Sequence, residues 1–327
     1  MPMKIILDCD PGIDDALALL LALASPEIEL IGITTVAGNS TVDHETRNAL
    51  SLLAMTGRAD MPVAMGCVRP LIKALVTAAD THGLTGMGYA VMPAPMSSAI
   101  ALHAVDFIIE QVLQAPGAIT IVAVGPLTNL ALALRKAPEI TPLIKQVICM
   151  GGAIHHPGNM PLSAEFNVWV DPHAAHMVYH SGLPITLVPL DVTYQCIWTH
   201  AHTERLRASA PHSPITQFIA DATRFYIEFH QREQNIDGCA INDALAMALV
   251  FAPDLVKTQA LFVDVSLADG PAHAMTIADP WQMSKHPPNM QVALKVDAER
   301  FLELFLERMA TNPPQTHASK SSHKPSE

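Results

Sequence analysis

The sequence predicts an α/β fold, with an open, mostly parallel central sheet flanked by helices and with additional C-terminal helices and strands. Short apolar segments suited to strands alternate with segments in which apolar residues recur at helical spacing. The strand segments are apolar throughout, as expected for a parallel sheet covered on both faces. The chain has 327 residues, half of them hydrophobic, so it can bury a large core.

Strands and helices are predicted to alternate over the first 190 residues. The strand segments are Lys4–Leu7, Glu29–Val36, Ile119–Val124, Gln146–Met150 and Ile185–Leu190. The helical segments are Ile13–Ala24, Val42–Thr56, Ser97–Leu113, Leu127–Lys136 and Pro172–Ser181. Ligands bind outside the carboxyl ends of the strands in such sheets. We therefore expect one site to which several strand ends contribute.

The pattern changes beyond residue 200. The chain is predicted to be mostly helical to about Phe251, with Ser213–Gln234 as the longest helix, and strand-rich from Leu255 to Val296. An amphipathic helix is expected at Ala298–Met309. Because no internal repeat or linker is evident, residues 1–312 are expected to form a single domain. Residues 313–327 are polar and rich in Pro and Ser, and are expected to be disordered.

Composition and charge exclude several classes of function. The formal net charge of -12 argues against nucleic acids and anionic membranes as partners. The longest apolar run, Ala16–Ala24, is too short to span a bilayer. The five cysteines are dispersed without a C-x-x-C pair, which indicates reduced thiols. No apolar leader precedes Lys4, so a cytoplasmic protein is expected.

Four aspartates, Asp8, Asp10, Asp14 and Asp15, lie between the first predicted strand and the first predicted helix. Folding would gather their carboxylates, which repel one another and raise their pKa values unless a cation neutralises them. A hard divalent metal with oxygen ligands would do so. Helix capping is the alternative, but it explains one or two aspartates rather than four.

Two further polar segments point to the same site. Asn242 and Asp243 precede an apolar helix, where capping alone would explain them. Glu165 and Asn167 occupy alternate positions, so in an extended segment they would face the same side, with Asn159 shortly before them. A carboxylate and two amides pointing one way would make a surface that binds vicinal hydroxyls.

In this order the segments resemble the nucleoside hydrolase family, of the inosine/uridine type. The matching segments are DCDPGIDDALA (8–18), TTVAGN (34–39), THG (81–83), VGPLTNLA (124–131), MGGA (150–153), AEFN (164–167) with DP (171–172), and Asp243. The resemblance extends to about residue 310. It implies a single catalytic domain that hydrolyses the N-glycosidic bond of ribonucleosides and releases base and ribose, as in purine and pyrimidine salvage.

The resemblance also implies a site. Calcium would be bound by Asp10, Asp15, Asp243 and the backbone carbonyl of Val124, and Asp10 would take a proton from the metal-bound water. Asp8 would support the neighbouring ligands. The residues that would hold or contact the ribose are Asp14, Asn39, Met150, Asn159, Glu165 and Asn167. Such positioning stabilises the positive charge that develops on the sugar. A homodimer or homotetramer is also implied.

The chain departs from the family pattern at Asn242, where many members carry a histidine that protonates the departing base. An amide cannot deliver a proton near neutral pH. His82 is the leading candidate for catalytic acid and for contact with the substrate. His230 or Tyr226 could take part instead, or the enzyme could accept only bases that leave readily. We expect His230 to be structural.

The base-binding side is otherwise hard to predict. Residues 73–96 are rich in Gly, Thr and Pro and are expected to form a mobile loop over the base. Trp198 and Tyr226 are candidates for stacking on it, although packing is the more common role of such residues. Base preference is therefore not predicted.

Two alternatives stay open. A haloacid-dehalogenase-like phosphatase also begins with D-x-D after a strand, but it expects a glycine followed by Thr or Val close behind, and here Pro11-Gly12-Ile13-Asp14-Asp15 follows instead. It also leaves the AEFN segment unexplained. A calcium-dependent nucleoside- or sugar-binding protein with little turnover is favoured only by Asn242. Release of free ribose, release of phosphate, or binding without product would distinguish the three.

Overall fold

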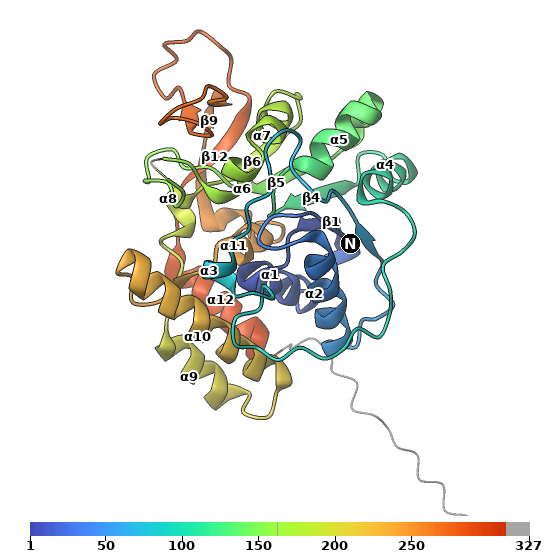
Figure 1. The fold of residues 1–327 in the computed structure, drawn as a ribbon, viewed down its shortest axis with the longest axis vertical. Helices are drawn as coiled ribbons and strands as arrows, with labels where there is room; N and C mark the ends of the chain where they lie inside the picture. Colours follow the sequence, from blue (N-terminus) through green and yellow to red (C-terminus); the bar gives the residue numbers. More distant parts are fainter. Residues whose placement is uncertain (162, 312–327) are drawn as a thin grey trace, which may run out of the picture.

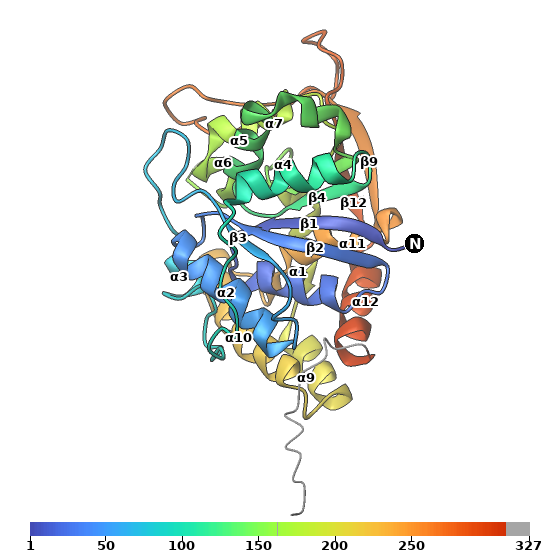
Figure 2. The same cartoon turned by 90° about the vertical axis from the view of Figure 1, so that its right-hand side faces the viewer.

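A computed structural model of the chain describes residues 1–161 and 163–311, so the tail predicted at 313–327 lies outside the described residues. An eight-stranded sheet runs through the molecule with helices on both faces, which confirms the predicted α/β class (Figure 1, Figure 2). The strand order is β3-β2-β1-β4-β5-β6-β12-β9. Among the described residues, no helix is both long and apolar enough to cross a membrane.

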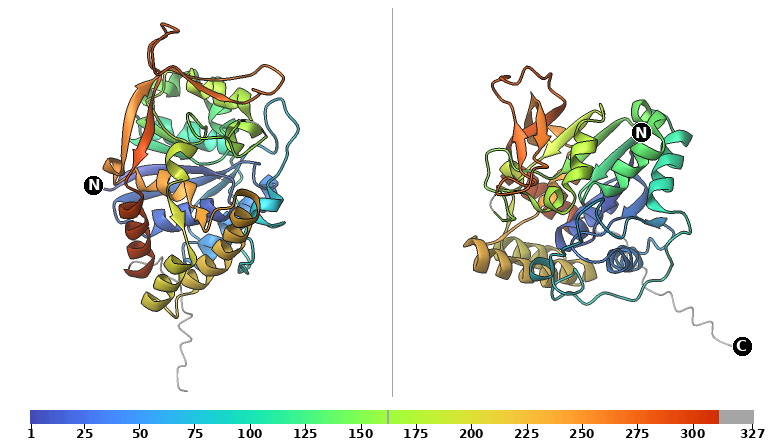
Figure 3. Two further views of the ribbon diagram at one scale, coloured as in Figure 1. Left: turned by 90° about the vertical axis from the view of Figure 1, so that its left-hand side faces the viewer. Right: turned by 45° about the horizontal axis from the view of Figure 1, so that its top comes forward.

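All neighbouring strands of this sheet are parallel except β9, which runs antiparallel to β12 at one edge (Figure 3). Their bounds are β1 Met3–Cys9, β2 Ile28–Thr35, β3 Val63–Met65, β4 Ile119–Ala123, β5 Gln146–Met150, β6 Ile185–Val188, β9 Val256–Leu261 and β12 Met290–Val296. Two small antiparallel sheets join β7 (Ile197–Trp198) to β8 (Cys239–Ala240) and β10 (Val263–Val265) to β11 (Thr276–Ala278).

The helices form two layers. Their bounds are α1 Ile13–Leu23, α2 Val42–Met55, α3 Ala79–His82, α4 Ala104–Gln114, α5 Thr128–Lys136, α6 Phe166–Val170, α7 Pro172–Tyr179, α8 Leu190–Thr193, α9 His200–Ser209, α10 Pro214–Gln234, α11 Asn242–Ala248 and α12 Ala298–Thr311. Short 3-10 helices span Pro138–Leu143 and Pro253–Leu255. Helices α4, α5 and α7 cover one face, and α1, α2, α11 and α12 cover the other (Figure 2).

The strand β1 shows why the sheet is buried on both faces. Ile5, Leu7 and Cys9 belong to the hydrophobic core beneath α1, whereas Ile6 belongs to the core beneath α4 and α5. All four side chains are buried. Successive side chains of a strand point to opposite faces, so a strand buried on both sides must be apolar at every position.

The topology places a site at the carboxyl end of β1. The strand order changes direction there, because β2 and β3 extend the sheet on one side of β1 and β4 and β5 extend it on the other. Such a switch point leaves a crevice at the strand ends. Helix α11 packs against α1, which brings a distant part of the chain to the same crevice.

Four predicted segments are corrected. The helix expected at Ser97–Leu113 begins only at Ala104, because His103 caps it and Ile100 pairs with Ala64 as an isolated bridge. The strand expected at Ile185–Leu190 ends at Val188. Residues 73–96 contain the helix α3. Glu165 and Asn167 are not in an extended segment, because α6 begins directly after Glu165.

Candidate active site

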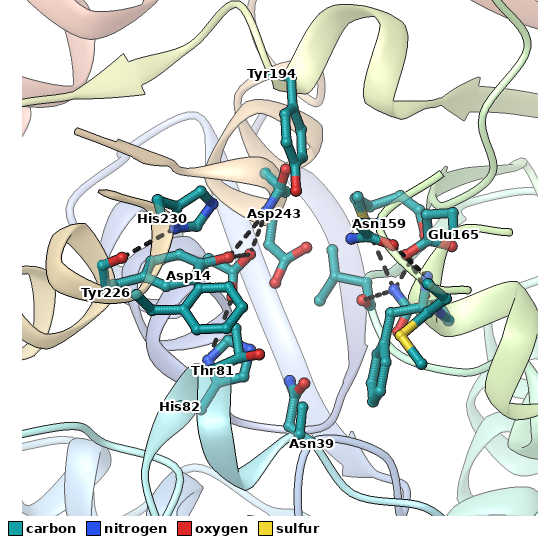
Figure 4. A pocket seen from close by; sticks show the side chains of 18 of the residues that line it. Asp14, Asn39, Thr81, His82, Asn159, Glu165, Tyr194, Tyr226, His230 and Asp243 are labelled. Carbon is teal, nitrogen blue, oxygen red and sulfur yellow. Dashed lines mark hydrogen bonds and ion pairs between the residues drawn. The ribbon is translucent and has the colours of Figure 1, made fainter. Parts of the chain in front are cut away.

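A pocket opens at the carboxyl ends of the strands and holds about 550 Å³ of empty space continuous with solvent (Figure 4). It collects side chains from α1, α3, α6, α10 and α11 and from the turns after β2, β4 and β5. Nine of the residues predicted from the sequence line it: Asp14, Asn39, His82, Val124, Met150, Asn159, Glu165, Asn167 and Asp243. Asp10 and Asp15 lie behind this lining, hydrogen-bonded to Asn39.

Three buried carboxylates meet at the deep end of the pocket. Asp14, Asp15 and Asp243 each offer an oxygen atom, and these atoms lie within 4.8 Å of one another. Asp14 and Asp15 are in the first turn of α1, and Asp243 is in the first turn of α11. The packing of α1 against α11 therefore joins two helix starts that are more than two hundred residues apart in sequence.

Asp15 is held by the backbone. The N–H of Asp10 donates to Asp15 Oδ1 and the N–H of Gly12 donates to Oδ2, both at 3.0 Å, and the Asn39 amide also donates to Oδ2, at 3.1 Å. Capping of α1 thus accounts for part of the role of Asp15. Its pKa is nevertheless raised to about 7, because burial and the nearby Asp14 outweigh these hydrogen bonds.

Asp10 has one satisfied and one unsatisfied oxygen. Its Oδ2 accepts the N–H of Asn39 at 2.7 Å, whereas its buried Oδ1 has no hydrogen-bond partner in the described structure. Glycines surround the carboxylate, since a Cβ at Gly38 would lie 2.0 Å from Oδ2 and one at Gly125 would lie 2.6 Å from Oδ1. A buried, unpaired carboxylate oxygen is costly. A cation is a partner that would remove this cost.

The electrostatics of the cluster agree with that need. Burial raises the pKa of Asp10 well above its ordinary value, and Asp15 and Glu45 raise it further. Burial likewise raises the pKa of Asp243, with Asp14 and Asp15 adding to the effect. Glu45, a buried carboxyl on the inner face of α2, was not predicted. A divalent cation would reverse these shifts, and all the donors are oxygen atoms, so the residues fit a hard metal.

Asp8 lies outside the pocket. Its Oδ1 accepts hydrogen bonds from the Thr34 hydroxyl at 2.6 Å and from the Asn129 amide at 2.8 Å. Burial raises its pKa to about 6, although the two hydrogen bonds lower it. Asp8 therefore ties β1 to β2 and to α5, next to the aspartates that face the crevice.

Glu165 dominates the opposite wall. As the N-cap of α6 it accepts the N–H groups of Asn167 at 2.9 Å and Val168 at 3.1 Å, and also that of Gly152 at 2.9 Å. Burial raises its pKa to about 7 despite these three bonds. The Asn167 amide donates to the Val124 carbonyl at 2.7 Å. The fold thus fixes this carboxylate and this amide at the pocket.

The two remaining predicted residues on that wall are Met150 and Asn159. The Asn167 Nδ2 atom lies 3.5 Å from the Met150 carbonyl oxygen and 3.6 Å from the Met150 sulfur. The Asn159 side-chain oxygen accepts the N–H of Phe166 at 2.9 Å. Asn159 is exposed to solvent and lies at the pocket, near Glu165 (Figure 4). It can therefore meet a ligand without a change of fold.

His82 lies on the other side of the pocket, at the end of α3. Its Nδ1 accepts the N–H of Ile13 at 3.1 Å and lies 4.0 Å from Asp14 Oδ1. Burial lowers the pKa of His82, although Asp14 opposes this shift. Because Nδ1 accepts a hydrogen bond, the neutral ring carries its proton on Nε2. His82 can therefore donate from Nε2 as a neutral imidazole.

Asn242 contacts the acidic cluster rather than standing apart from it. Its Nδ2 donates to Asp14 Oδ2 at 2.8 Å and to the Tyr226 hydroxyl at 3.2 Å. The Tyr226 hydroxyl lies 3.4 Å from the same Asp14 oxygen and can donate to it. Asn242 thus orients Asp14 through a hydrogen bond, but its amide cannot transfer a proton to a departing base.

Helix α10 supplies residues that were not predicted as site residues. Phe229 and Gln234 line the pocket with Tyr226 and His230, and this spacing puts all four on one face of α10. Gln234 donates to the hydroxyl of Tyr194 at 3.1 Å. His230 bonds the Tyr226 carbonyl at 2.9 Å, and burial lowers its pKa to about 4. The helical spacing was a signal that could have identified this face.

Trp198 does not belong to the pocket. It is fully buried, stacks on His202 with ring centroids 5.1 Å apart, and meets the edge of Phe305 at 5.4 Å. Its indole N–H donates to the Thr203 hydroxyl at 2.9 Å. Trp198 therefore has the packing role expected as the more common one and is excluded as a stacking candidate, because the short strand β7 turns it into the core.

Comparisons with known proteins agree with this geometry. A family model described as inosine-uridine preferring nucleoside hydrolase matches residues 5–303. The inosine-uridine preferring nucleoside hydrolase of Crithidia fasciculata is 39% identical, over 94% of this chain and 98% of that protein. The pyrimidine-specific ribonucleoside hydrolase RihA of Citrobacter koseri is 37% identical, over 95% of this chain and 99% of that protein. The solved structure of a purine-preferring ribonucleoside hydrolase from Gardnerella vaginalis has a TM-score of 0.87 and is 38% identical, covering 94% of this chain and 98% of that protein.

Proposed function

Because the chain belongs to the inosine-uridine preferring nucleoside hydrolase family, and is therefore an N-glycosyl hydrolase that acts on ribonucleosides, we propose how its own residues carry out the reaction. Calcium is the proposed metal, bound by Asp10, Asp15, Asp243 and the carbonyl of Val124. The observation that carries this proposal is the unpaired, buried Oδ1 of Asp10 beside a cluster of buried carboxylates. Calcium prefers such oxygen donors.

When bound, the metal would lower the pKa of a water molecule and hold the ribose 2′- and 3′-hydroxyls. Asp10 would accept a proton from that water. Its Oδ1 has no hydrogen-bond partner among the described residues, so this oxygen is available to the metal and to the water beside it. The bond from Asn39 to Oδ2 keeps the carboxylate in one orientation.

The two walls of the pocket hold the sugar. Asp14 and Asn39 lie on one side of it, and Glu165, Asn167 and Asn159 lie on the other, with Met150 beside them. As the glycosidic bond breaks, positive charge develops on the ribose, and fixed carboxylates stabilise that charge. Glu165 is suited to this role because three backbone N–H groups hold it in place.

His82 is the proposed donor to the departing base. Its Nε2–H is free to face the base, since Nδ1 is engaged by Ile13. As a neutral ring, His82 donates a hydrogen bond to the base; a full proton would come from the protonated ring, which the nearby Asp14 favours. Tyr226, His230 and Gln234 line the same part of the pocket.

A panel of ribonucleosides tests the proposed function. Purified protein is incubated with inosine, adenosine, guanosine, uridine and cytidine, and with the corresponding 2′-deoxynucleosides, and free base and ribose are measured. We expect base and ribose in equal amounts from ribonucleosides and poor reaction of the deoxy compounds, which lack one hydroxyl for the metal. Tight binding without ribose would instead favour the nucleoside-binding alternative, and phosphate release from a phosphomonoester would favour the phosphatase.

The named relatives differ in the base that they prefer, so the panel also decides base preference. A cytoplasmic homodimer or homotetramer acting in nucleoside salvage completes the proposal. All five cysteines are free and buried, which suits a reducing compartment. Light scattering of the purified protein would give the number of subunits.

A further inference from the structure

Two histidines and an aspartate form a second polar cluster, on α7 and β10, that does not line the pocket. His176 Nδ1 lies 2.8 Å from Asp264 Oδ1, and His180 Nε2 lies 2.9 Å from the same oxygen. One ligand-type atom from each residue lies within 4.8 Å of the other two. Each side chain is about one third exposed, so ions can reach the cluster from solvent.

The local structure dictates this arrangement. His176 is in α7 and His180 is its C-cap, and the N–H of His180 bonds the carbonyl of His176 at 3.1 Å, so both rings leave the same side of the helix end. Asp264 is the central residue of β10, between the buried Val263 and Val265. Alternation along the strand turns Asp264 away from the core and toward the two rings.

Asn289 fixes the distance between the two elements. Its amide donates to the carbonyls of Tyr179 at 3.0 Å and Val263 at 2.9 Å, and its side-chain oxygen accepts the N–H of Val263 at 2.8 Å. Tyr179 directly precedes His180, and Val263 directly precedes Asp264. The backbone positions of the histidine and the aspartate are thus set, and such preorganisation lowers the cost of binding.

The hydrogen bonds engage the atoms that a metal would use. Both rings bond Asp264 Oδ1, which also accepts the N–H of Val265 at 2.7 Å, so each ring places a protonated nitrogen toward the carboxylate. Within the described residues, these three bonds all go to Oδ1 and leave Oδ2 available. A divalent ion can replace the two imidazole protons and bind both nitrogens and the carboxylate.

We propose that His176, His180 and Asp264 form a surface site for a divalent transition ion of the zinc class, separate from the acidic cluster of the pocket. Two imidazoles at i and i+4 with one carboxylate are a donor set that zinc accepts. Nitrogen donors disfavour calcium and magnesium, which take oxygen ligands. The bound ion would join α7 to β10, and α7 follows directly on α6, which carries Asn167.

The test is a zinc titration of the full-length protein by isothermal calorimetry in excess calcium, which occupies oxygen-ligand sites. We expect one zinc ion per chain. H176Q and H180Q should each weaken binding by at least about tenfold, because loss of even an outer-shell partner typically costs 10–100-fold. Glutamine retains a hydrogen-bond donor toward Asp264, so a purely hydrogen-bonding role would survive these changes. H212Q, at an exposed histidine elsewhere, serves as the matched control and should bind zinc normally.

A second readout guards against a misfolded variant. Zinc should raise the Tm of the wild-type protein and of H212Q, since a ligand that binds the native state stabilises it. The double variant H176Q/H180Q should keep the far-UV spectrum and the ribonucleoside hydrolysis of the wild type but lose this zinc-dependent rise. Absence of zinc binding in the wild type, or equal binding by the folded double variant, would overturn the proposal. Neither result bears on the proposed calcium site.

Discussion

The two sides of the pocket are built differently. On the side proposed to bind the sugar, backbone N–H groups hold two carboxylates: Asp10 and Gly12 donate to Asp15, and Gly152, Asn167 and Val168 donate to Glu165. On the side proposed to face the base, several contacts join side chains, as Asn242 with Tyr226 and Gln234 with Tyr194, although His82 accepts a backbone N–H from Ile13. Bonds from backbone N–H groups are part of the fold, whereas a single substitution can remove a contact between two side chains.

This difference has a functional consequence. Groups fixed by the backbone keep their geometry in any sequence that adopts the fold, so the chemistry at the sugar is constrained. A group that is held by another side chain can take a new orientation when that neighbouring side chain is substituted. Asn242 illustrates this freedom, because it donates to Asp14 where a proton donor to the base could stand. The relatives named above accordingly share a reaction and differ in base preference.

The largest effect is expected from D10N, which removes the proposed base on the sugar side. The amide keeps the shape of the carboxylate but cannot accept the proton, so kcat should fall by about 10²–10⁴-fold. Ribose release and circular dichroism would be measured together. D8N is the matched control, because Asp8 is also a buried carboxyl, two residues earlier in β1, but its Oδ1 is bonded to Thr34 and Asn129. Near-normal turnover by D10N would exclude Asp10 as the base.

H82Q probes the base side. If His82 protonates the departing base, hydrolysis of ribonucleosides should fall by about 10²-fold or more. Hydrolysis of 4-nitrophenyl riboside should fall much less, because its leaving group departs without a proton. Initial rates on both substrates give the comparison. An equal loss on both would mean that His82 only shapes the pocket.

These two sides were not equally predictable from the sequence. Asp10, Asp14 and Asp15 stand in one short segment after an apolar strand, so their convergence could be predicted. Five strands of the central sheet could also be predicted one by one, and β9 and β12 lie in the segment predicted to be strand-rich. The strand β3 was missed, because its three residues carry too little pattern. Asp243 was linked to them through the family resemblance, because the packing of α1 on α11 is a long-range contact.

The base side was less predictable for a physical reason. Tyr226, Phe229 and His230 occupy one face of α10, and helical spacing shows that they share a face but not what the face meets. Trp198 is equally aromatic and packs in the core. The helix at 166–170 escaped prediction because its start depends on capping by Glu165, a residue that also suits an extended segment.

A pH-dependent effect on stability would sharpen the account of the sugar side. Burial raises the pKa of Asp15 and of Glu165 to about 7 in the folded protein. In the unfolded state the same carboxyl groups have ordinary pKa values near 4. Between about pH 4 and pH 7 the folded state therefore keeps these carboxyl groups protonated, whereas the unfolded state has lost the protons. The stability that these groups contribute is present below about pH 4 and declines as pH rises toward 7.

The expected result is a Tm of the metal-free protein that falls between about pH 4.5 and pH 7.5, and a rise in Tm on calcium addition that is larger at pH 7.5 than at pH 5. Differential scanning calorimetry with and without chelator measures both. A calcium effect that is the same at both pH values would mean that these carboxyl groups are not linked to metal binding.

The smallest effect on activity is expected from W198F. Trp198 lies in the core, and its loss removes one hydrogen bond and some packing, about 1–3 kcal/mol. Tm should fall by a few degrees, while the ratio of kcat/KM for uridine to that for inosine stays the same. Y226F is the comparison from within the pocket. A changed ratio in W198F would place Trp198 in base recognition.

The most direct test of the central claim is to measure bound calcium and ribose release in the same preparations. Protein is stripped with a chelator, assayed in metal-free buffer, and reloaded with calcium. The account predicts no ribose release from the stripped protein and recovery in proportion to one calcium ion per chain, with no calcium binding by D243N. Full ribose release from protein shown to contain no metal would contradict it.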